Sequence, residues 1–230
     1  MTGALINTAT VLVGSTVGPF LQSRFPERVR QIVMWGVGLI SLVIGMQVSL
    51  TTKNILIVLA SLLAGGICGE VLRLHGGLNR LGDTLQIALS VAKDSMFSKG
   101  FVPASLFFCV DPMTILGAIQ DGLRGDYSLL ASKAILDGFA SLALAASMGW
   151  GVLFATLTVL LYQGALTLGA SLVKAFLTDA MVAELTATGG TLILAIGLNL
   201  LDLTMIRIAN FLPALVIAPM LVALLPLAGT

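Results

Sequence analysis

Charged residues and histidine are scarce in this sequence, and their scarcity limits the kind of protein it can be. Of 230 residues only 10% are charged and one is histidine, whereas 57% are hydrophobic and the mean hydropathy is +1.05. A soluble domain carries about 25% charged residues, because its surface has to face water. The composition therefore excludes a soluble fold. A lipid bilayer has to cover the apolar surface, and in a bilayer the backbone polar groups are satisfied within helices.

The sequence also lacks the groups on which catalysis and cofactor binding depend. It contains no HExxH, GxSxG or Walker A motif, and His75, its single histidine, is expected at the surface. Cys68 and Cys109 lie in apolar runs without a CxxC spacing, so we expect two buried thiols and neither a disulfide nor a metal site. A net charge of +1 without a Lys/Arg cluster argues against a nucleic-acid partner. We therefore expect no enzyme, no cofactor and no ATP-driven transport by this chain alone.

Long apolar runs are what the sequence has in quantity. A membrane-spanning helix needs about 20 mainly apolar residues, and eight segments come near that length. The expected fold class is all-α, a polytopic transmembrane helical bundle of about eight spans, with polar connectors at 25–32 and 177–185. The expected spans are 3–22, 33–50, 54–73, 101–121, 128–148, 150–173, 186–203 and 209–228.

Residues 78–96 have a different, amphipathic pattern. Leu78, Leu81, Leu85 and Leu89 recur at three- and four-residue spacing, with charged residues between them. This pattern is typical of a helix that lies in the membrane interface. A solvated linker is the alternative.

Two parts of the chain resemble each other, which predicts an internal repeat. Residues 3–12 and 151–160 match at Gly, Leu, two Thr, Val and Leu, and residues 38–47 and 190–199 both end in Ile-Gly-x and a side-chain amide. The two helices that follow align more weakly. We expect one integral membrane domain, made of a first three-helix repeat (1–73), an interfacial connector (74–100), a central helix pair (101–149) and a second three-helix repeat (150–230).

The order of these parts predicts how the repeats are oriented. A unit of three spans followed by two further spans places its second copy upside down in the membrane. Inverted repeats recur in secondary transporters, where they give alternating access, and they also occur in channels.

Lysine and arginine are unevenly divided between the loops. Arg28, Arg73 and Arg80 are among eight basic residues that follow odd-numbered spans, and only Lys53, Arg124 and Lys174 follow even-numbered ones. The positive-inside rule then places the odd loops in the cytoplasm and both termini outside. This orientation requires an even number of spans.

Carboxylates inside the spans are the main candidates for a functional site, because a charge in mid-membrane costs about 2.5–3.5 kcal/mol. Asp111 and Asp121 lie on one stripe of the span 101–121, and Pro112 should kink or break that helix. Asp111 and the freed carbonyls could bind a cation. Alternatively, Asp111 caps the second half of the helix.

A second pair of charges lies in the span 128–148. Lys133 and Asp137 are four residues apart and share one face of the helix. They either neutralise each other as a structural ion pair, or Asp137 exchanges Lys133 for a cationic substrate or a proton. The repeat-related amides Gln47 and Asn199 complete the expected binding site.

The segment from Phe101 to Leu123, with its Phe-Val-Pro-Ala-Ser-Leu-Phe-Phe-Cys-Val-Asp-Pro-Met-Thr run, resembles the YqgA/YdfK family of bacterial inner-membrane proteins of unknown function. The resemblance extends over essentially the whole chain and implies an inner-membrane location. The family pattern has Gly where this chain has Asp111, whereas Gln120, Asp121, Lys133 and Asp137 match it. The resemblance implies no substrate.

Together these patterns favour a secondary transporter for a small, cationic solute, bound by Asp111, Gln120, Asp121, Lys133, Asp137, Gln47 and Asn199. An ion or solute channel and a non-transporting membrane scaffold are the alternatives. The expected partners are the solute and the lipid bilayer, with a homo-oligomer possible in principle.

Overall fold

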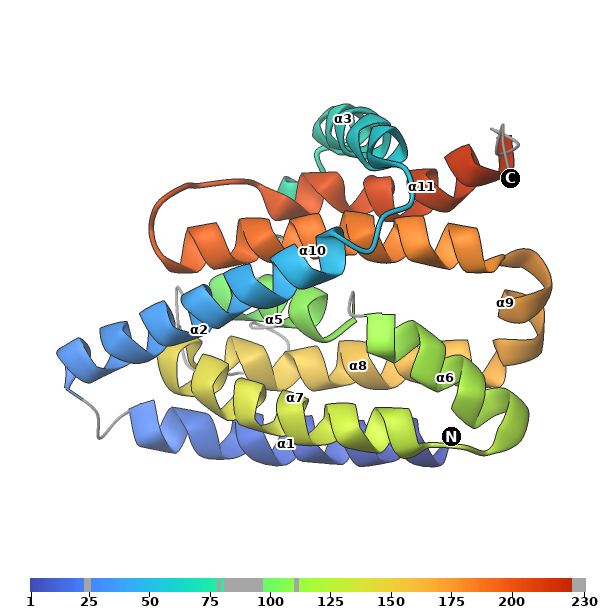
Figure 1. The fold of residues 1–230 in the computed structure, drawn as a ribbon. Helices are drawn as coiled ribbons and strands as arrows, with labels where there is room; N and C mark the ends of the chain where they lie inside the picture. Colours follow the sequence, from blue (N-terminus) through green and yellow to red (C-terminus); the bar gives the residue numbers. More distant parts are fainter. Residues whose placement is uncertain (23–25, 78–79, 81–96, 110–111, 225–230) are drawn as a thin grey trace.

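The computed structural model describes residues 1–22, 26–77, 80, 97–109 and 112–224, and all elements within them are helical. This confirms the all-α fold class. The elements are α1 (Thr2–Gln22), α2 (Glu27–Ser49), α3 (Ile55–Val71), α5 (Phe97–Cys109), α6 (Pro112–Arg124), α7 (Ser128–Met148), α8 (Gly151–Leu168), α9 (Ala170–Phe176), α10 (Asp179–Leu200), the 3-10 helix η1 (Ile208–Phe211) and α11 (Leu212–Leu224) (Figure 1).

Several of these helices are long and apolar enough to cross a membrane. In the described part of the chain five meet that test by themselves, namely α1, α2, α7, α8 and α10. The bent pair of α5 and α6 is a sixth if it counts as one span. The apolar segments Ile55–Val71 and Ile208–Leu224 are shorter, and 17 helical residues extend only about 26 Å. The expected count of eight spans therefore stays a prediction.

The α5–α6 pair confirms the break expected at Pro112. α5 ends at Cys109, α6 begins at Pro112, and the two helices are bent by 57°. Proline has no backbone N–H and clashes with the preceding turn, so it is tolerated in the first turn of a helix and disrupts a helix interior.

Glycines set the closest helix contacts. A Cβ atom on Gly45 of α2 would lie 2.6 Å from the backbone nitrogen of Leu194 in α10, and one on Gly38 would lie 3.3 Å from the carbonyl oxygen of Gly197. The residue numbers run in opposite directions along the two helices, so α2 and α10 are antiparallel. Small residues let helix backbones approach closely, as is common in membranes.

α1 packs against two helices of opposite direction. Along α7 its contacts rise in step, from Gly3 beside Leu130 to Gly18 beside Ala145, so α1 and α7 are parallel. Along α8 the order is reversed, because the hydroxyls of Ser15 and Thr156 are 3.5 Å apart and Met1 reaches Gly164 near the far end of α8.

The helices form two groups. The first group consists of α1 and α5 to α9, and the second of α2, α3, α10, η1 and α11; contacts are dense within each group, and the groups meet mainly where α2 touches α7. Figure 1 shows α1 and α7 at the bottom, and α10 and α11 with the nearly end-on α3 at the top. The start of α1 and the end of α11 lie toward the same end of the bundle.

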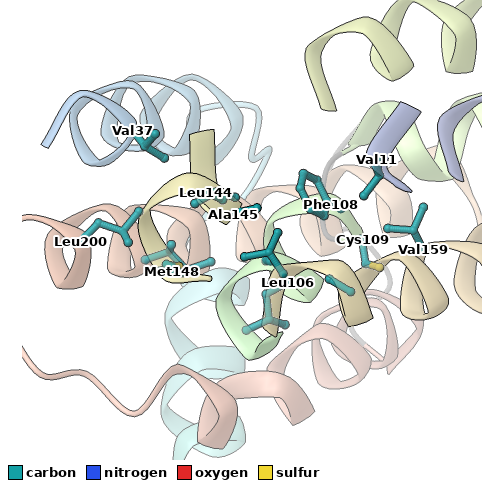
Figure 2. Close-up of a cluster of buried hydrophobic side chains, with 14 of the residues drawn as sticks. Val11, Val37, Leu106, Phe108, Cys109, Leu144, Ala145, Met148, Val159 and Leu200 are labelled. Carbon is teal, nitrogen blue, oxygen red and sulfur yellow. The ribbon is translucent and has the colours of Figure 1, made fainter. Parts of the chain in front are cut away.

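The apolar core is centred on α5. Phe108 is fully buried, and Leu106 and Cys109 are nearly so. Figure 2 shows these side chains between residues of α1, α7 and α8, with Val37 of α2 and Leu200 of α10 at the edge of the cluster. This core joins the two groups.

Two expectations were wrong, and a third falls on residues that the structure does not describe. The connectors expected at 25–32 and 177–185 are largely helical, because α2 begins at Glu27 after Pro26 and α10 begins at Asp179 after the capping residue Thr178. Cys68 is exposed on the surface of α3, and only Cys109 is buried. The interfacial helix expected at 78–96 lies outside the described residues, apart from Arg80.

Candidate functional site

Lys133 and Asp137 form an ion pair inside the bundle. Lys133 Nζ lies 2.6 Å from Asp137 Oδ2, and the two side chains are 1% and 4% exposed. They are one turn apart on α7, and Asp137 lies near the middle of that span. Their neighbours Ile135 and Leu136 point outward, as the helical period requires. The predicted pair thus exists and is shielded from its surroundings.

A third polar side chain reaches the same carboxylate from another helix. Asn7 of α1 is fully buried, and its Nδ2 donates a hydrogen bond of 2.9 Å to Asp137 Oδ2. The close packing of α1 on α7, which Gly3 and Gly14 permit, brings the two residues together. A single carboxylate oxygen therefore accepts from an ammonium and an amide, both of which stabilise its charged form.

A cavity of about 320 Å³ adjoins the ion pair. Of the lining residues that the structure describes, Asp137 alone is ionisable; the others are glycine or apolar and come from α2, α5, α7 and α10. The cavity therefore lies where the two groups of helices meet. Its size is at the lower end of the range for pockets that hold small ligands, about 300–1,000 Å³.

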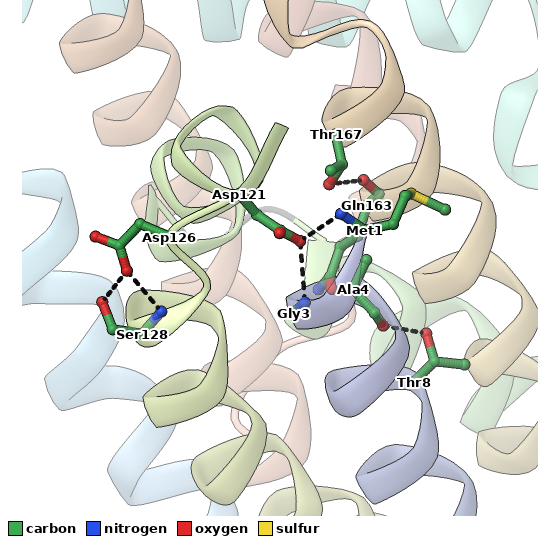
Figure 3. A network of polar contacts seen from close by, with 9 residues as sticks. All are labelled: Met1, Gly3, Ala4, Thr8, Asp121, Asp126, Ser128, Gln163 and Thr167. Carbon is green, nitrogen blue, oxygen red and sulfur yellow. Dashed lines mark hydrogen bonds and ion pairs between the residues drawn. The ribbon is translucent and has the colours of Figure 1, made fainter. Parts of the chain in front are cut away.

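Asp121 is buried elsewhere in the first group, at the start of α1. Its Oδ2 accepts from the backbone N–H of Gly3 at 2.9 Å and lies 3.0 Å from the amino group of Met1 (Figure 3). The first N–H groups of a helix have no partner within the helix, and the helix dipole favours a negative charge there. Asp121 therefore anchors the end of α6 to the start of α1.

Glu184 of α10 has a similar anchoring position in the second group. Its carboxylate accepts from the backbone N–H groups of Lys53 and Asn54, at 2.7 and 2.9 Å, and from the Thr52 hydroxyl at 2.6 Å. These bonds hold the turn before α3. The sequence offered no sign of this, because Glu184 lay in a segment expected to be a polar connector.

Some buried polar atoms have no hydrogen-bond partner. Both amide atoms of Gln163 in α8 are in this state, as is Oδ1 of Asn7. On α8, Gln163 is seven residues beyond Thr156, and on α1 Asn7 is eight residues before Ser15. Because Ser15 and Thr156 are in contact and the helices are antiparallel, Asn7 and Gln163 lie at a similar level of the bundle.

The remaining expected site residues lie apart from the ion pair. Gln47 and Gln120 are exposed. Asn199 is half-buried and holds the turn after α10, since its side chain binds the backbone of Ile206 and the Thr204 hydroxyl. Asp111 lies outside the described residues. Among the six expected residues that the structure describes, the direct contact it shows is the one between Lys133 and Asp137.

The sequence pattern did not assign Asn7 to the site. Asn7 was visible as a polar residue in the first apolar segment, but nothing in the linear order connects it with Asp137. The spacing of Gly3, Gly14 and Gly18 was the available signal, because it marks the face of α1 that packs closely on another helix, and Asn7 lies on that face.

Comparison with known proteins assigns the family. Residues 2–223 match the family described as "Protein of unknown function (DUF554)". The chain belongs to the DUF554 family. Two relatives of this DUF554 protein cover nearly its full length, and no solved structure matches it. The uncharacterized membrane protein YdfK of Bacillus subtilis (strain 168) is 28% identical over 226 residues, 96% of each chain, and the uncharacterized protein YqgA of Escherichia coli (strain K12) is 32% identical over 220 residues, 94% of each chain.

These matches confirm the family resemblance and agree with the apolar helices in identifying a membrane protein. They assign no chemistry to DUF554. In the described part of the chain, no three His, Cys, Asp or Glu side chains gather as a metal site would require. The chemistry has to be argued from the ion pair and its cavity.

Proposed function

We propose that this DUF554 protein moves a small cationic solute across the membrane by alternating access. The observation that carries the proposal is the buried ion pair of Lys133 and Asp137, whose carboxylate lies near the middle of α7 and lines a cavity. Ionisable residues at membrane depth are costly and most often mark solute or proton pathways.

Stability alone is a weak reason for such a pair. Removing two charges from water costs several kcal/mol for each ion, and well-packed apolar residues in their place are often as stable or more so. The pair makes sense if Asp137 has to attract a cation and Lys133 has to compensate the carboxylate when that cation is absent. In this mechanism the solute's positive charge takes the place of the Lys133 ammonium at Asp137 Oδ2.

The arrangement of the helices supports an inverted repeat as part of the proposal. α1 and α8 correspond in the repeat, as do α2 and α10, and each helix packs antiparallel against its counterpart. Such pairing is what a two-fold axis in the membrane plane produces. The two repeats therefore interlock, and we propose that the moving parts are the two packed groups of helices, with the cavity between them.

The proposed location is the inner membrane, with the start of α1 and the end of α11 outside. The basic residues that follow α1 and α3, such as Arg28 and Arg73, favour this orientation by the positive-inside rule. A cysteine at position 28 should then resist impermeant thiol reagents added outside intact cells, in a chain whose two natural cysteines are replaced by alanine. A cysteine at Thr2 should react.

The test is uptake of labelled methylammonium and spermidine by liposomes that contain the purified protein. Saturable uptake that Asp137→Asn abolishes would support the proposal. Arg207→Met is the matched control, because it breaks the exposed ion pair of Arg207 and Glu70, 3.3 Å apart. Flux that rises without saturation would indicate a channel, and no flux of either cation would count against solute movement.

A further inference from the structure

The cavity beside Asp137 opens at the outer surface of the bundle, between α2 and α7. Three of its lining residues, Leu136, Phe139 and Ile40, are 62%, 72% and 51% exposed, whereas Asp137 and Ile193 are buried. The exposed residues form the rim, on α7 and α2, and the buried ones form the floor. We call this cavity the α2–α7 crevice.

The depth of the crevice decides what can reach it from that side. Leu136 lies near the middle of the 21-residue span α7, and its rim neighbours are apolar. The rim therefore faces hydrocarbon, where a hydrated ion is strongly disfavoured. A molecule that passes the rim has to be dissolved in the bilayer first.

The residues that line the crevice also indicate which kind of molecule fits it. Its walls are apolar, from Val37 and Ile44 on α2 to Phe107 on α5, so they suit a hydrocarbon body. Among the lining residues that the structure describes, the one ionisable group is a carboxylate, and a ligand complementary to it carries a positive charge. A neutral lipid chain would fill the walls and could not replace the Lys133 ammonium at Asp137 Oδ2.

We propose that the ligand of the α2–α7 crevice is an amphiphilic organic cation, a lipophilic amine or quaternary ammonium ion, that enters sideways from the bilayer and places its charge at Asp137. The proposal rests on the proposed function, because it names the class of solute that exchanges with Lys133. It adds a route through the gap between α2 and α7, which the transport proposal does not require.

The experiment measures binding of tetramethylammonium and tetrabutylammonium to the full-length protein in detergent, by thermal shift and calorimetry. We expect tetrabutylammonium to bind at least tenfold more tightly, because its butyl groups fill the apolar walls. A neutral carbinol of the same size should not compete with it. Equal binding of the two ions, or full competition by the neutral compound, would overturn the proposal.

A matched pair of variants tests whether tetrabutylammonium binds in the crevice. Leu136→Trp fills the rim, whereas Ile135→Trp changes the adjacent residue, which is equally exposed at 63% and does not line the crevice. We expect at least tenfold weaker tetrabutylammonium binding for Leu136→Trp and unchanged binding for Ile135→Trp. Equal affinities in the two variants would exclude the crevice. Size-exclusion profiles check the fold, and a shift of L136W toward a monomer would instead assign the rim to contact between copies.

Two results separate this inference from the transport proposal. If methylammonium or spermidine is taken up saturably and tetrabutylammonium does not bind, the crevice proposal fails and the transport proposal stands. If tetrabutylammonium binds as expected and no cation crosses the liposome membrane, the crevice is a binding site and the transport proposal fails. Asp137→Glu, which keeps the charge, should retain binding that Asp137→Asn loses, so a folding defect cannot mimic the result.

Discussion

Asn7 of α1 and Asp137 of α7 are 130 positions apart in the chain, and a hydrogen bond of 2.9 Å joins their buried side chains. The bond ties α1 to the helix that carries the ion pair. Hydrogen bonds to charged groups contribute about 1.5–3 kcal/mol, more than bonds between neutral groups. The contact therefore holds α1 against α7 at the position of the ion pair.

Replacing Asn7 by leucine should lower the free energy of unfolding by about 1.5–3 kcal/mol, because Asp137 loses a donor that it cannot replace with water. Ser15→Ala is the control, since Ser15 is equally buried on α1 and bonds mainly to carbonyls of its own helix. Denaturation in mild detergent measures both. A loss for Ser15→Ala as large as that for Asn7→Leu would assign the effect to general packing.

Lys133→Met should lower the free energy of unfolding by about 3–5 kcal/mol, because it leaves Asp137 buried and without its counter-ion. The double variant with Asp137→Leu should recover most of that stability, since an apolar pair often replaces a buried ion pair without loss. Melting temperatures of the wild type, the two single variants and the double variant give the coupling energy. A double variant as unstable as Lys133→Met would show that the two side chains act separately.

Two glycines of α2 should respond in opposite ways to alanine. At Gly45 the added methyl group would lie 2.6 Å from the Leu194 nitrogen. Gly45→Ala should therefore push α2 away from α10 and lower the free energy of unfolding by about 1–3 kcal/mol. At Gly36 nothing lies within 4 Å, and Gly36→Ala should be neutral or stabilise by up to about 1 kcal/mol through helix propensity. Equal effects at both positions would contradict the close α2–α10 contact.

Gln163→Met should raise the melting temperature. Both amide atoms of Gln163 are buried without a partner, and an unsatisfied polar group costs about 1–3 kcal/mol. Methionine has a similar length and carries no such group. A lower melting temperature would mean that the amide binds water or solute in the folded protein. Thr156→Val, on the same face of α8, serves as a second buried polar position for comparison.

The stability of the protein should depend on pH through Asp126, which lies outside the membrane spans. The hydroxyl and the backbone N–H of Ser128 donate to its carboxylate, at 2.7 and 3.1 Å, and lower the pKa of Asp126 from its ordinary value of 3.8. Because the folded-state pKa is the lower one, the stabilisation is present above pH 3.8 and is lost as the pH falls through the folded-state value. Asp126→Ala should therefore melt slightly below the wild type at pH 7, and the difference should vanish in stronger acid.

Apolar run length located most of the helices in advance. The run 128–148 coincides with α7, and the run 3–22 with α1, because spans are set by a repeated local property of the residues. The starts of α2 and α10 were missed, because polar residues form their first turns and the sequence pattern assigned those residues to connectors. Glu184 illustrates this, since its charge suggested a connector and its carboxylate instead satisfies the turn at Asn54.

The site was predictable only where its residues lie close in sequence. Lys133 and Asp137 are one turn apart, so helix geometry alone pairs them. Asn7, in contrast, depends on which helices become neighbours, and apolar faces of similar composition do not specify that. Gln47 and Asn199 were chosen for their matching places in the repeat, and only Asn199 has a described structural task, at the turn before Ile206.

The division of the helices into two groups affects how the protein is made. The second group takes α2 and α3 from one end of the chain and α10 and α11 from the other, and the bond between Thr52 and Glu184 spans 132 positions. During synthesis α2 and α3 are in the bilayer before their partners exist, with the close-packing faces of Gly38 and Gly45 uncovered. We expect this group to assemble only after α11 has been inserted. A chain that stops before α10 would leave the two early helices exposed to quality-control proteases.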